Sequence, residues 1–282
     1  MAMRRQWGLA LLALLLLGAA QPAATGAPAL EATAAASPSA GTAAEPRFPW
    51  RKRVRRAARF ADRRLGTVCF AVVGERSTLR GHCRNRGFDS ASVIKAMFLV
   101  AYVRQRGVRH RRLRRSERRL LAPMIRRSDN VTATILRDRM GPGPIYRLAH
   151  AAGMRRFHLH PVWGLSRVTA RDQARFAYRW RRLIPRRHRD YAFHLLASVV
   201  RSQRWGMPRV RLPRWRIYFK AGFVPGYGGW KINQTALFRR GARRRLAISV
   251  LTRGNPTLGY GAKTVQGVAA RLLGHYNAIT AR

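Results

Sequence analysis

Residues 215–252 read WRIYFKAGFVPGYGGWKINQTALFRRGARRRLAISVLT and contain three apolar runs separated by turn residues. The runs cover 215–223, 230–238 and 244–252, and each is rich in the β-branched and aromatic side chains that favour strands. Pro- and Gly-containing turns at 225–229 and at Gly241 stand between them. The pattern predicts three consecutive antiparallel strands in the C-terminal part of the chain.

A further pair of strands is predicted far upstream. Residues 66–73 (GTVCFAVV) have strand composition, and residues 78–84 (TLRGHCR) follow as a return strand. In a hairpin centred on Arg76, Cys69 and Cys83 lie equally far from the turn and face each other across the ladder. Two interpretations remain open, a disulfide bond or two buried free thiols.

Helical patterns fill most of the region between the two groups of strands. They cover 92–106, 116–127, 131–140, 144–152, 170–182 and 187–201, with further helices at 51–64 and 263–276. We therefore predict an α+β fold with two lobes. An antiparallel sheet of about five strands, built from both chain ends and flanked by helices, would pack against an inserted all-helical lobe at about 92–212. A cleft between the lobes is the expected place for an active site.

The N-terminal residues have the pattern of a secretory signal peptide. Arg4 and Arg5 precede an apolar run, and small residues follow, so we expect a signal peptide at 1–20 with cleavage between about 20 and 27. An uncleaved anchor is the alternative, although the apolar run is short for a membrane span. Residues 21–49 are Ala- and Pro-rich and indicate a flexible linker, which leaves 50–282 as the folded domain. We expect a secreted protein without a stable membrane span after cleavage.

The charge is extreme, with 58 Lys and Arg against 10 Asp and Glu and a net charge of +48. Only five of the basic residues are lysines. Codon bias towards arginine explains this excess, and a surface that binds an anionic cell-wall polymer is the alternative. No nucleic-acid recognition motif accompanies the basic runs, so no specific nucleic-acid partner is expected.

Ser92-Val93-Ile94-Lys95 places a serine and a lysine one helical turn apart. The positive end of the helix dipole and burial in a cleft both disfavour a charged ammonium at Lys95. A neutral Lys95 amine is able to take the proton of the Ser92 hydroxyl, and the Ser92 N–H is suited to stabilise an oxyanion. The alternative is a helix that merely begins with serine, with Asp89 or Ser90 as its N-cap.

Two further motifs follow in the chain. Ser128-Asp129-Asn130 precedes a predicted helix, which Asp129 would cap. Lys220-Ala221-Gly222 lies on a predicted strand, where Lys220 would point into the cleft and Gly222 would leave room for a substrate. The N–H of Phe223 is then the second candidate oxyanion donor.

The three motifs resemble the signature of penicillin-recognising serine enzymes, which is Ser-x-x-Lys, then Ser-Asp-Asn, then Lys-(Thr/Ala)-Gly. The resemblance is to the class A β-lactamase branch in particular, together with its D,D-peptidase-like relatives. The resemblance covers about residues 60–276 and implies the same two-lobe fold. It implies that Ser92 is acylated with Lys95 as its base and that Ser128 relays a proton to the leaving nitrogen. It further implies that Asn130 binds a substrate amide and that Lys220 binds the substrate carboxylate. No metal and no cofactor are expected.

The sequence departs from this family pattern where the acyl-enzyme is hydrolysed. Class A β-lactamases use a glutamate on a loop after Ser-Asp-Asn to activate water, and this chain has no glutamate after Glu117. The corresponding segment, HLHPVWGLSRVTARD, contains only Asp172 as an acid, and Ala221 replaces the usual threonine. The predicted function is therefore a monomeric, exported serine acyl-hydrolase acting on a β-lactam or a peptidoglycan stem peptide, with inefficient β-lactam hydrolysis. A D,D-carboxypeptidase-like enzyme and a catalytically idle polyanion-binding protein are the alternatives.

Overall fold

The computed structural model describes residues 48–74, 77–241, 244–274 and 276, all of which belong to one compact unit, Glu45–Arg282. The expected signal peptide and nearly all of the expected linker lie outside the described residues. No helix in the described part of the chain is long and apolar enough to cross a membrane.

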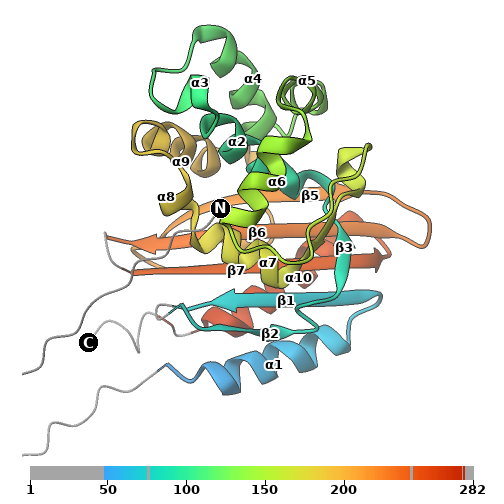
Figure 1. Cartoon of the computed structure of the whole chain (residues 1–282). Coiled ribbons are helices and arrows are strands. Elements are labelled where there is room, and N and C mark those ends of the chain that lie inside the picture. The colour runs from blue at the N-terminus through green and yellow to red at the C-terminus, as the bar shows by residue number, and fades with distance from the viewer. Residues whose placement is uncertain (1–47, 75–76, 242–243, 275, 277–282) are drawn as a thin grey trace, which may run out of the picture. The chain divides into compact units, whose positions relative to one another are not determined.

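Five strands from both ends of the described chain form one antiparallel sheet (Figure 1). They are β1 (Thr67–Val73), β2 (Leu79–His82), β5 (Arg216–Val224), β6 (Trp230–Arg240) and β7 (Arg244–Asn255). Their order in the sheet is β2-β1-β7-β6-β5, so the N-terminal hairpin pairs with the last strand of the C-terminal meander. The α+β fold and the sheet built from both chain ends are confirmed.

The strands alternate their side chains between two apolar clusters, one on each face of the sheet. In β1, Cys69, Ala71 and Val73 belong to the first cluster, whereas Val68 and Phe70 belong to the second. This period of two is the expected pattern for a strand whose two faces are both covered. The sheet is therefore an interior layer, and its buried faces explain the nearly continuous apolar runs in the sequence.

Helices cover both faces (Figure 1). One face carries α1 (Trp50–Asp62) and α10 (Leu258–Leu273), which pack against each other. The other face is contacted mainly by α7 (Ala170–Tyr178) and α9 (Arg189–Ala197), and the helical lobe is built from all the helices inserted between the two groups of strands. These are α2 (Lys95–Val103), α3 (Arg106–Arg109), α4 (Arg115–Arg126), α5 (Asn130–Met140), α6 (Pro142–Ala151), α7 (Ala170–Tyr178), α8 (Trp180–Leu183) and α9 (Arg189–Ala197).

Several helix boundaries differ from the predictions. The helix expected at 92–106 begins as a 3₁₀ turn, η1 (Ala91–Ile94), and α2 ends at Val103 because Gln105 is extended. The expected cap Ser116 lies inside α4, where the Glu117 carboxylate instead accepts a hydrogen bond from the Arg114 N–H at 2.6 Å. The last helix begins at Leu258, earlier than expected, because Thr257 caps it.

The structure decides one open prediction and reveals one element that was not predicted. Cys69 and Cys83 form a disulfide bond, which removes the free-thiol alternative. A two-stranded sheet of β3 (Gly87–Asp89) and β4 (Arg167–Thr169) was not predicted, since each strand has only three residues. This small sheet links the segment before Ser92 to the segment that leads into α7, in the middle of the helical insertion.

Candidate active site

The turn that carries Ser92 is held from two sides by backbone-directed hydrogen bonds. The Asn233 side chain, on β6, donates to the carbonyls of Asp89 and Ser90 at 2.8 and 3.3 Å. From the other side, the Ser90 N–H donates to the Ser166 carbonyl at 2.8 Å. Ala91, between them, has a φ of +45°, which an L-residue adopts only when its surroundings enforce it. The position of Ser92 is therefore fixed by contacts from the sheet and from the segment before β4.

Strand β5 approaches this turn at Gly222. A Cβ atom at Gly222 would lie 2.6 Å from the backbone nitrogen of Ser92 and 2.8 Å from that of Val93. Both distances are far inside van der Waals contact, and backbone atoms cannot move aside as a flexible side chain does. Only glycine lets the strand lie this close to η1, so the space at this position is taken up by the backbone of the turn that bears Ser92, whereas the sequence analysis had assigned that space to a substrate.

The Lys95 amine is buried and lies among three oxygen acceptors. Its Nζ is 2.5 Å from the Ser128 carbonyl oxygen, 2.7 Å from Asn130 Oδ1 and 3.3 Å from Ser128 Oγ. Burial lowers the pKa of Lys95 to about 7, and the nearby Asp129 carboxylate opposes this shift. A neutral amine has two N–H bonds, so donation to the two carbonyl oxygens leaves its lone pair free to accept a proton from a hydroxyl.

Ser128 occupies the junction between α4 and α5 in a left-handed conformation, with a φ of +60°. Asp129 caps α5 by accepting the Thr132 N–H at 2.8 Å, as predicted. The Ser128 hydroxyl oxygen lies 2.9 Å from Lys220 Nζ and 3.3 Å from Lys95 Nζ. Two amines therefore converge on one hydroxyl, and the strained backbone at Ser128 is the kind of distortion that persists at functional sites.

Lys220 is completely buried on β5. Its Nζ donates to Ser128 Oγ and, at 2.7 Å, to the Ala221 carbonyl oxygen, and no ion pair of this amine occurs in the described part of the chain. Burial, together with the nearby charge of Lys95, lowers the pKa of Lys220 well below its ordinary value. A buried amine without an anion is suited to receive one, because an arriving carboxylate restores its charge.

The remaining predicted site residues contribute in different ways. Asn130 is exposed, and its Oδ1 accepts from Lys95, which leaves the amide nitrogen available. Phe223 lies on β5, the edge strand of the sheet, opposite Ile232 of β6. The Ala221 side chain is buried in the apolar cluster behind the sheet, so this residue offers the site only its backbone. Within the described residues, the Ser92 hydroxyl makes no hydrogen bond.

Trp163 is a site residue that the sequence analysis did not assign. Its indole ring lies over the Lys95 amine, with Nζ 4.8 Å from the ring centroid. The indole N–H donates to Thr134 Oγ1 at 3.1 Å, and the ring meets Phe98 edge-on. The tryptophan is thus held on α5 and α2 and covers one side of the amine with an apolar surface. Its only sequence signal was a tryptophan in the segment HLHPVWGLSRVTARD, which has no helix or strand periodicity.

The expected cap residues of η1 have other partners. Asp89 forms an ion pair with Lys231 of β6 and lies 3.8 Å from Arg167 of β4. The Ser90 hydroxyl donates to carbonyl oxygens, including those of Trp163 and Gly164 at 3.3 Å. Neither side chain caps the turn, because β3 directs Asp89 to the sheet and Ser90 to the segment that carries Trp163.

Asp172, the only acid of the segment in which a hydrolytic glutamate was sought, is buried in the first turn of α7. Its carboxylate accepts the Arg156 N–H at 3.0 Å, and its own N–H donates to Thr169 Oγ1 at 3.1 Å. These contacts give it a structural role at the start of the helix. No described carboxylate hydrogen-bonds to Ser92, Lys95 or Ser128.

Comparisons with known proteins identify the family and the fold. The model of the family described as "Beta-lactamase enzyme family" matches residues 109–276, a range that includes Ser128, Asn130 and Lys220 but begins after Ser92. No curated protein matches the sequence closely enough to count as a relative.

Three solved structures illustrate the similarity in fold. A β-lactamase from Sphaerobacter thermophilus has a TM-score of 0.68 at 19% identity, over 83% of this chain and 99% of that one. A class A β-lactamase from Mycobacterium abscessus has a TM-score of 0.67 at 18% identity, over 80% and 99% of the two chains. A β-lactamase from Desulfarculus baarsii has a TM-score of 0.64 at 18% identity, over 80% and 98%.

Proposed function

The chain belongs to the beta-lactamase enzyme family of serine hydrolases, and from that premise we propose that Ser92 attacks a β-lactam or a D-Ala-D-Ala-like peptide and becomes acylated. The observation that carries the proposal is the convergence of Lys95 and Lys220 on the Ser128 hydroxyl beside the turn that bears Ser92. A cluster of two buried amines and a hydroxyl has a high cost in desolvation, which function explains better than stability does.

In the first step, the neutral Lys95 amine takes the proton from the Ser92 hydroxyl while the oxygen bonds to the carbonyl carbon of the substrate. The electron pair of the C=O bond moves to oxygen, and the N–H groups of Ser92 and Phe223 stabilise the resulting oxyanion. The close approach of β5 to η1 at Gly222 supports this pairing, since it brings the two donor segments together. A pKa of about 7 for Lys95 leaves a large fraction of the amine neutral at physiological pH.

In the second step, the C–N bond breaks and the leaving nitrogen takes the proton of the Ser128 hydroxyl. Lys95 now carries the proton taken from Ser92 and gives it to Ser128, so that each group ends the step in its starting protonation state. The 3.3 Å separation of Lys95 Nζ and Ser128 Oγ supports this transfer. The second amine, Lys220, stabilises the Ser128 oxygen during the exchange from 2.9 Å.

Substrate recognition falls to Lys220 and Asn130. The carboxylate that β-lactams and stem peptides share would pair with Lys220, which has no anionic partner in the described part of the chain. The Asn130 amide nitrogen, left free by the bond of Oδ1 to Lys95, would donate to a carbonyl of the substrate.

Hydrolysis of the acyl-enzyme is proposed to be slow. The chain has no glutamate after Glu117, and Asp172 is engaged with the backbone of Arg156. The Trp163 ring covers Lys95, where an apolar surface leaves no hydrogen-bonding group to orient a water molecule. With a β-lactam, the enzyme would therefore remain acylated much longer than an efficient β-lactamase does. The export pattern at 1–20 would place this chemistry outside the cytoplasm, where peptidoglycan is found.

The test is labelling with a fluorescent penicillin, followed over time, beside a Ser92→Ala variant. The proposal predicts rapid labelling that persists after removal of free penicillin, and no labelling of the variant. Rapid loss of the label would identify an efficient β-lactamase and refute the slow hydrolysis. Labelling that survives Ser92→Ala would refute the assignment of Ser92 as the nucleophile. No labelling of the wild-type protein would refute the β-lactam assignment and favour the idle polyanion-binding alternative.

A further inference from the structure

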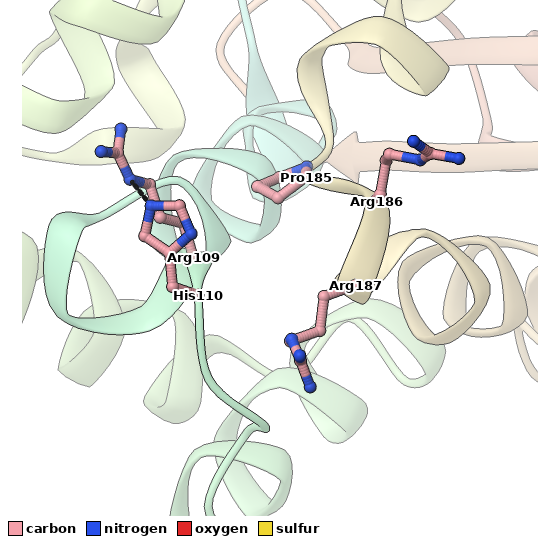
Figure 2. Close-up of a pocket in the computed structure, with 5 residues that line it drawn as sticks. All are labelled: Arg109, His110, Pro185, Arg186 and Arg187. Carbon is pink, nitrogen blue, oxygen red and sulfur yellow. Dashed lines mark hydrogen bonds between the residues drawn. The ribbon is translucent and has the colours of Figure 1, made fainter.

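A basic hollow of about 720 Å³ lies in the helical region, apart from the residues of the active site. It is lined by Arg109 and His110, at the end of α3, and by Pro185, Arg186 and Arg187, which precede α9 (Figure 2). The basic side chains are exposed, and no acidic side chain lines the hollow. By contrast, a second hollow of about 590 Å³ along β5 has Asp190 in its lining together with its arginines.

The two walls of the basic hollow are held at a fixed spacing. The buried His188 ring lies with Nε2 3.0 Å from the Val108 carbonyl oxygen, which ties the segment of Arg186 and Arg187 to α3. A second tie is the hydrogen bond from the Arg104 guanidinium to the Leu183 carbonyl oxygen at 2.8 Å. Such a frame reduces the conformational entropy that a ligand would otherwise have to remove from the two segments.

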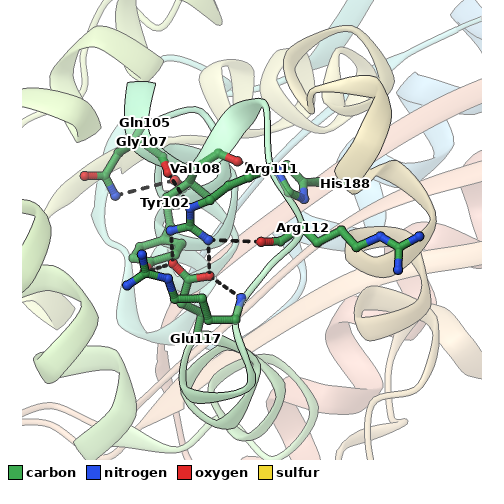
Figure 3. A network of polar contacts seen from close by, with 9 residues as sticks. Tyr102, Gln105, Gly107, Val108, Arg111, Arg112, Glu117 and His188 are labelled. Carbon is green, nitrogen blue, oxygen red and sulfur yellow. Dashed lines mark hydrogen bonds and ion pairs between the residues drawn. The ribbon is translucent and has the colours of Figure 1, made fainter.

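Glu117, the acid bound to the Arg111 side chain just after this hollow's first wall, is fully occupied. Glu117 accepts two hydrogen bonds from the Arg111 guanidinium, at 2.6 and 2.9 Å, and one each from the Tyr102 hydroxyl and the Arg114 N–H (Figure 3). These bonds lower the pKa of Glu117 to about 2, so it stays ionised and bound to Arg111. The charges of Arg109, Arg186 and Arg187 have no ion-pair partner within the described chain, and an added anion is needed to compensate them.

The arginines of this region also repel one another. The neighbouring charge of Arg109 contributes, after burial, to a lowered pKa of Arg104. Arg181 and Arg186 act in the same way on Arg189, whose Nε donates to the Ile184 carbonyl. An anion in the hollow would relieve this repulsion, so binding and local stability should increase together.

We propose that this hollow is a binding site for a phosphate-type oligoanion, and that it is independent of the proposed acylation at Ser92. Arginine guanidinium groups bind phosphate oxygens in a bidentate manner. Three arginines line this hollow, and their three positive charges are more than the single charge of a carboxylate ligand would neutralise. His110 accepts the Arg109 Nε–H at its Nε2, at 2.7 Å, which leaves its Nδ1–H to donate to the same anion. The ligand class is a chain of phosphate groups, as in a polyphosphate or a phosphodiester polymer.

The probe is sodium tripolyphosphate, titrated calorimetrically into the folded protein at one fixed salt concentration. The test variant is Arg109→Gln/Arg187→Gln, and the matched control is Arg51→Gln/Arg55→Gln on α1, which removes the same charge from exposed arginines elsewhere. We expect the test variant to weaken binding by about tenfold or more and the control by less than about twofold, because only the former loses charge-assisted hydrogen bonds. Orthophosphate should bind far more weakly than tripolyphosphate.

Equal losses in the two variants would show that the affinity comes from net charge alone and would overturn the site. Tight binding of orthophosphate with no gain for tripolyphosphate would refute the oligoanion class. Both variants should keep the wild-type rate of penicillin labelling, and neither should have a lower melting temperature than the wild-type protein without ligand. This readout separates a lost site from a misfolded protein, and failure of the acylation proposal would leave the calorimetric result unaffected.

Discussion

The pH dependence of acylation tests the role of Lys95 quantitatively. Its pKa of about 7 results from burial, and the base must be neutral to take the Ser92 proton. The neutral fraction of an amine with that pKa is about 10% at pH 6, about 50% at pH 7 and about 90% at pH 8. The second-order rate constant of acylation should therefore rise about tenfold from pH 6 to pH 8 and change little above that range through this group.

The assay is the initial rate of labelling by a fluorescent penicillin, measured at limiting concentration so that it reports the free enzyme. Lys220 must regain a proton to pair with the substrate carboxylate, so the profile falls again at higher pH, and only the rising limb is assigned to Lys95. Lys95→Arg is the matched control, since arginine keeps the positive charge but stays protonated, and it should label at least about a hundredfold more slowly at every pH. A flat profile between pH 6 and pH 8, or rising behaviour displaced towards the ordinary lysine pKa of 10.5, would refute the reasoning.

Three further changes have defined outcomes. Gly222→Ala places a Cβ against the Ser92 backbone nitrogen and should slow penicillin labelling by about a hundredfold or more, because a displacement of about 1 Å has that effect in other active sites. A wild-type labelling rate would contradict the close approach of β5 to η1. Trp163→Ala opens one side of Lys95 to water, so the penicillin label should be lost faster. Because solvation raises the pKa of an amine, the rising limb of the pH profile of acylation should also move to higher pH. An unchanged limb would show that the ring does not set the pKa of Lys95. Glu117→Gln removes the partner of Arg111 and should lower the free energy of unfolding at pH 7 by about 2–4 kcal/mol in urea titrations. Because folding lowers the pKa of Glu117 from 4.5 to about 2, its contribution is present above pH 4.5 and is lost as the pH falls towards 2, and the variant should lack that part of the acid dependence.

Much of the fold could be predicted from local pattern. The runs at 215–252 and 66–84 carry the composition and turn residues of strands, and the structure pairs them in one sheet. The disulfide could be narrowed to two alternatives from the symmetry of Cys69 and Cys83 about the turn, but sequence alone could not choose between them. The short strands β3 and β4 escaped prediction because three residues carry no periodicity, and their pairing depends on chain segments about 80 residues apart.

The candidate site was predictable to the extent that its residues fall into spaced motifs. Ser92, Lys95, Ser128, Lys220 and Gly222 were selected from the sequence, and the structure brings their elements together. The supporting contacts were not predictable, because Trp163, Asn233 and Lys231 act through tertiary neighbours rather than through sequence spacing. The complete burial of Lys220 was not predictable from the sequence either, since a position on a strand gives the direction of the side chain but not how deeply it is buried.

Intact-protein mass spectrometry after exposure to benzylpenicillin, followed by peptide mapping, tests the acyl-enzyme most directly. The account predicts a stable mass increase equal to one whole penicillin molecule, because ring opening releases no fragment. It predicts that the modified peptide contains Ser92 and that Ser92→Ala abolishes the adduct. An adduct on another residue, or no adduct while Ser92→Ala and wild-type protein behave alike, would contradict it.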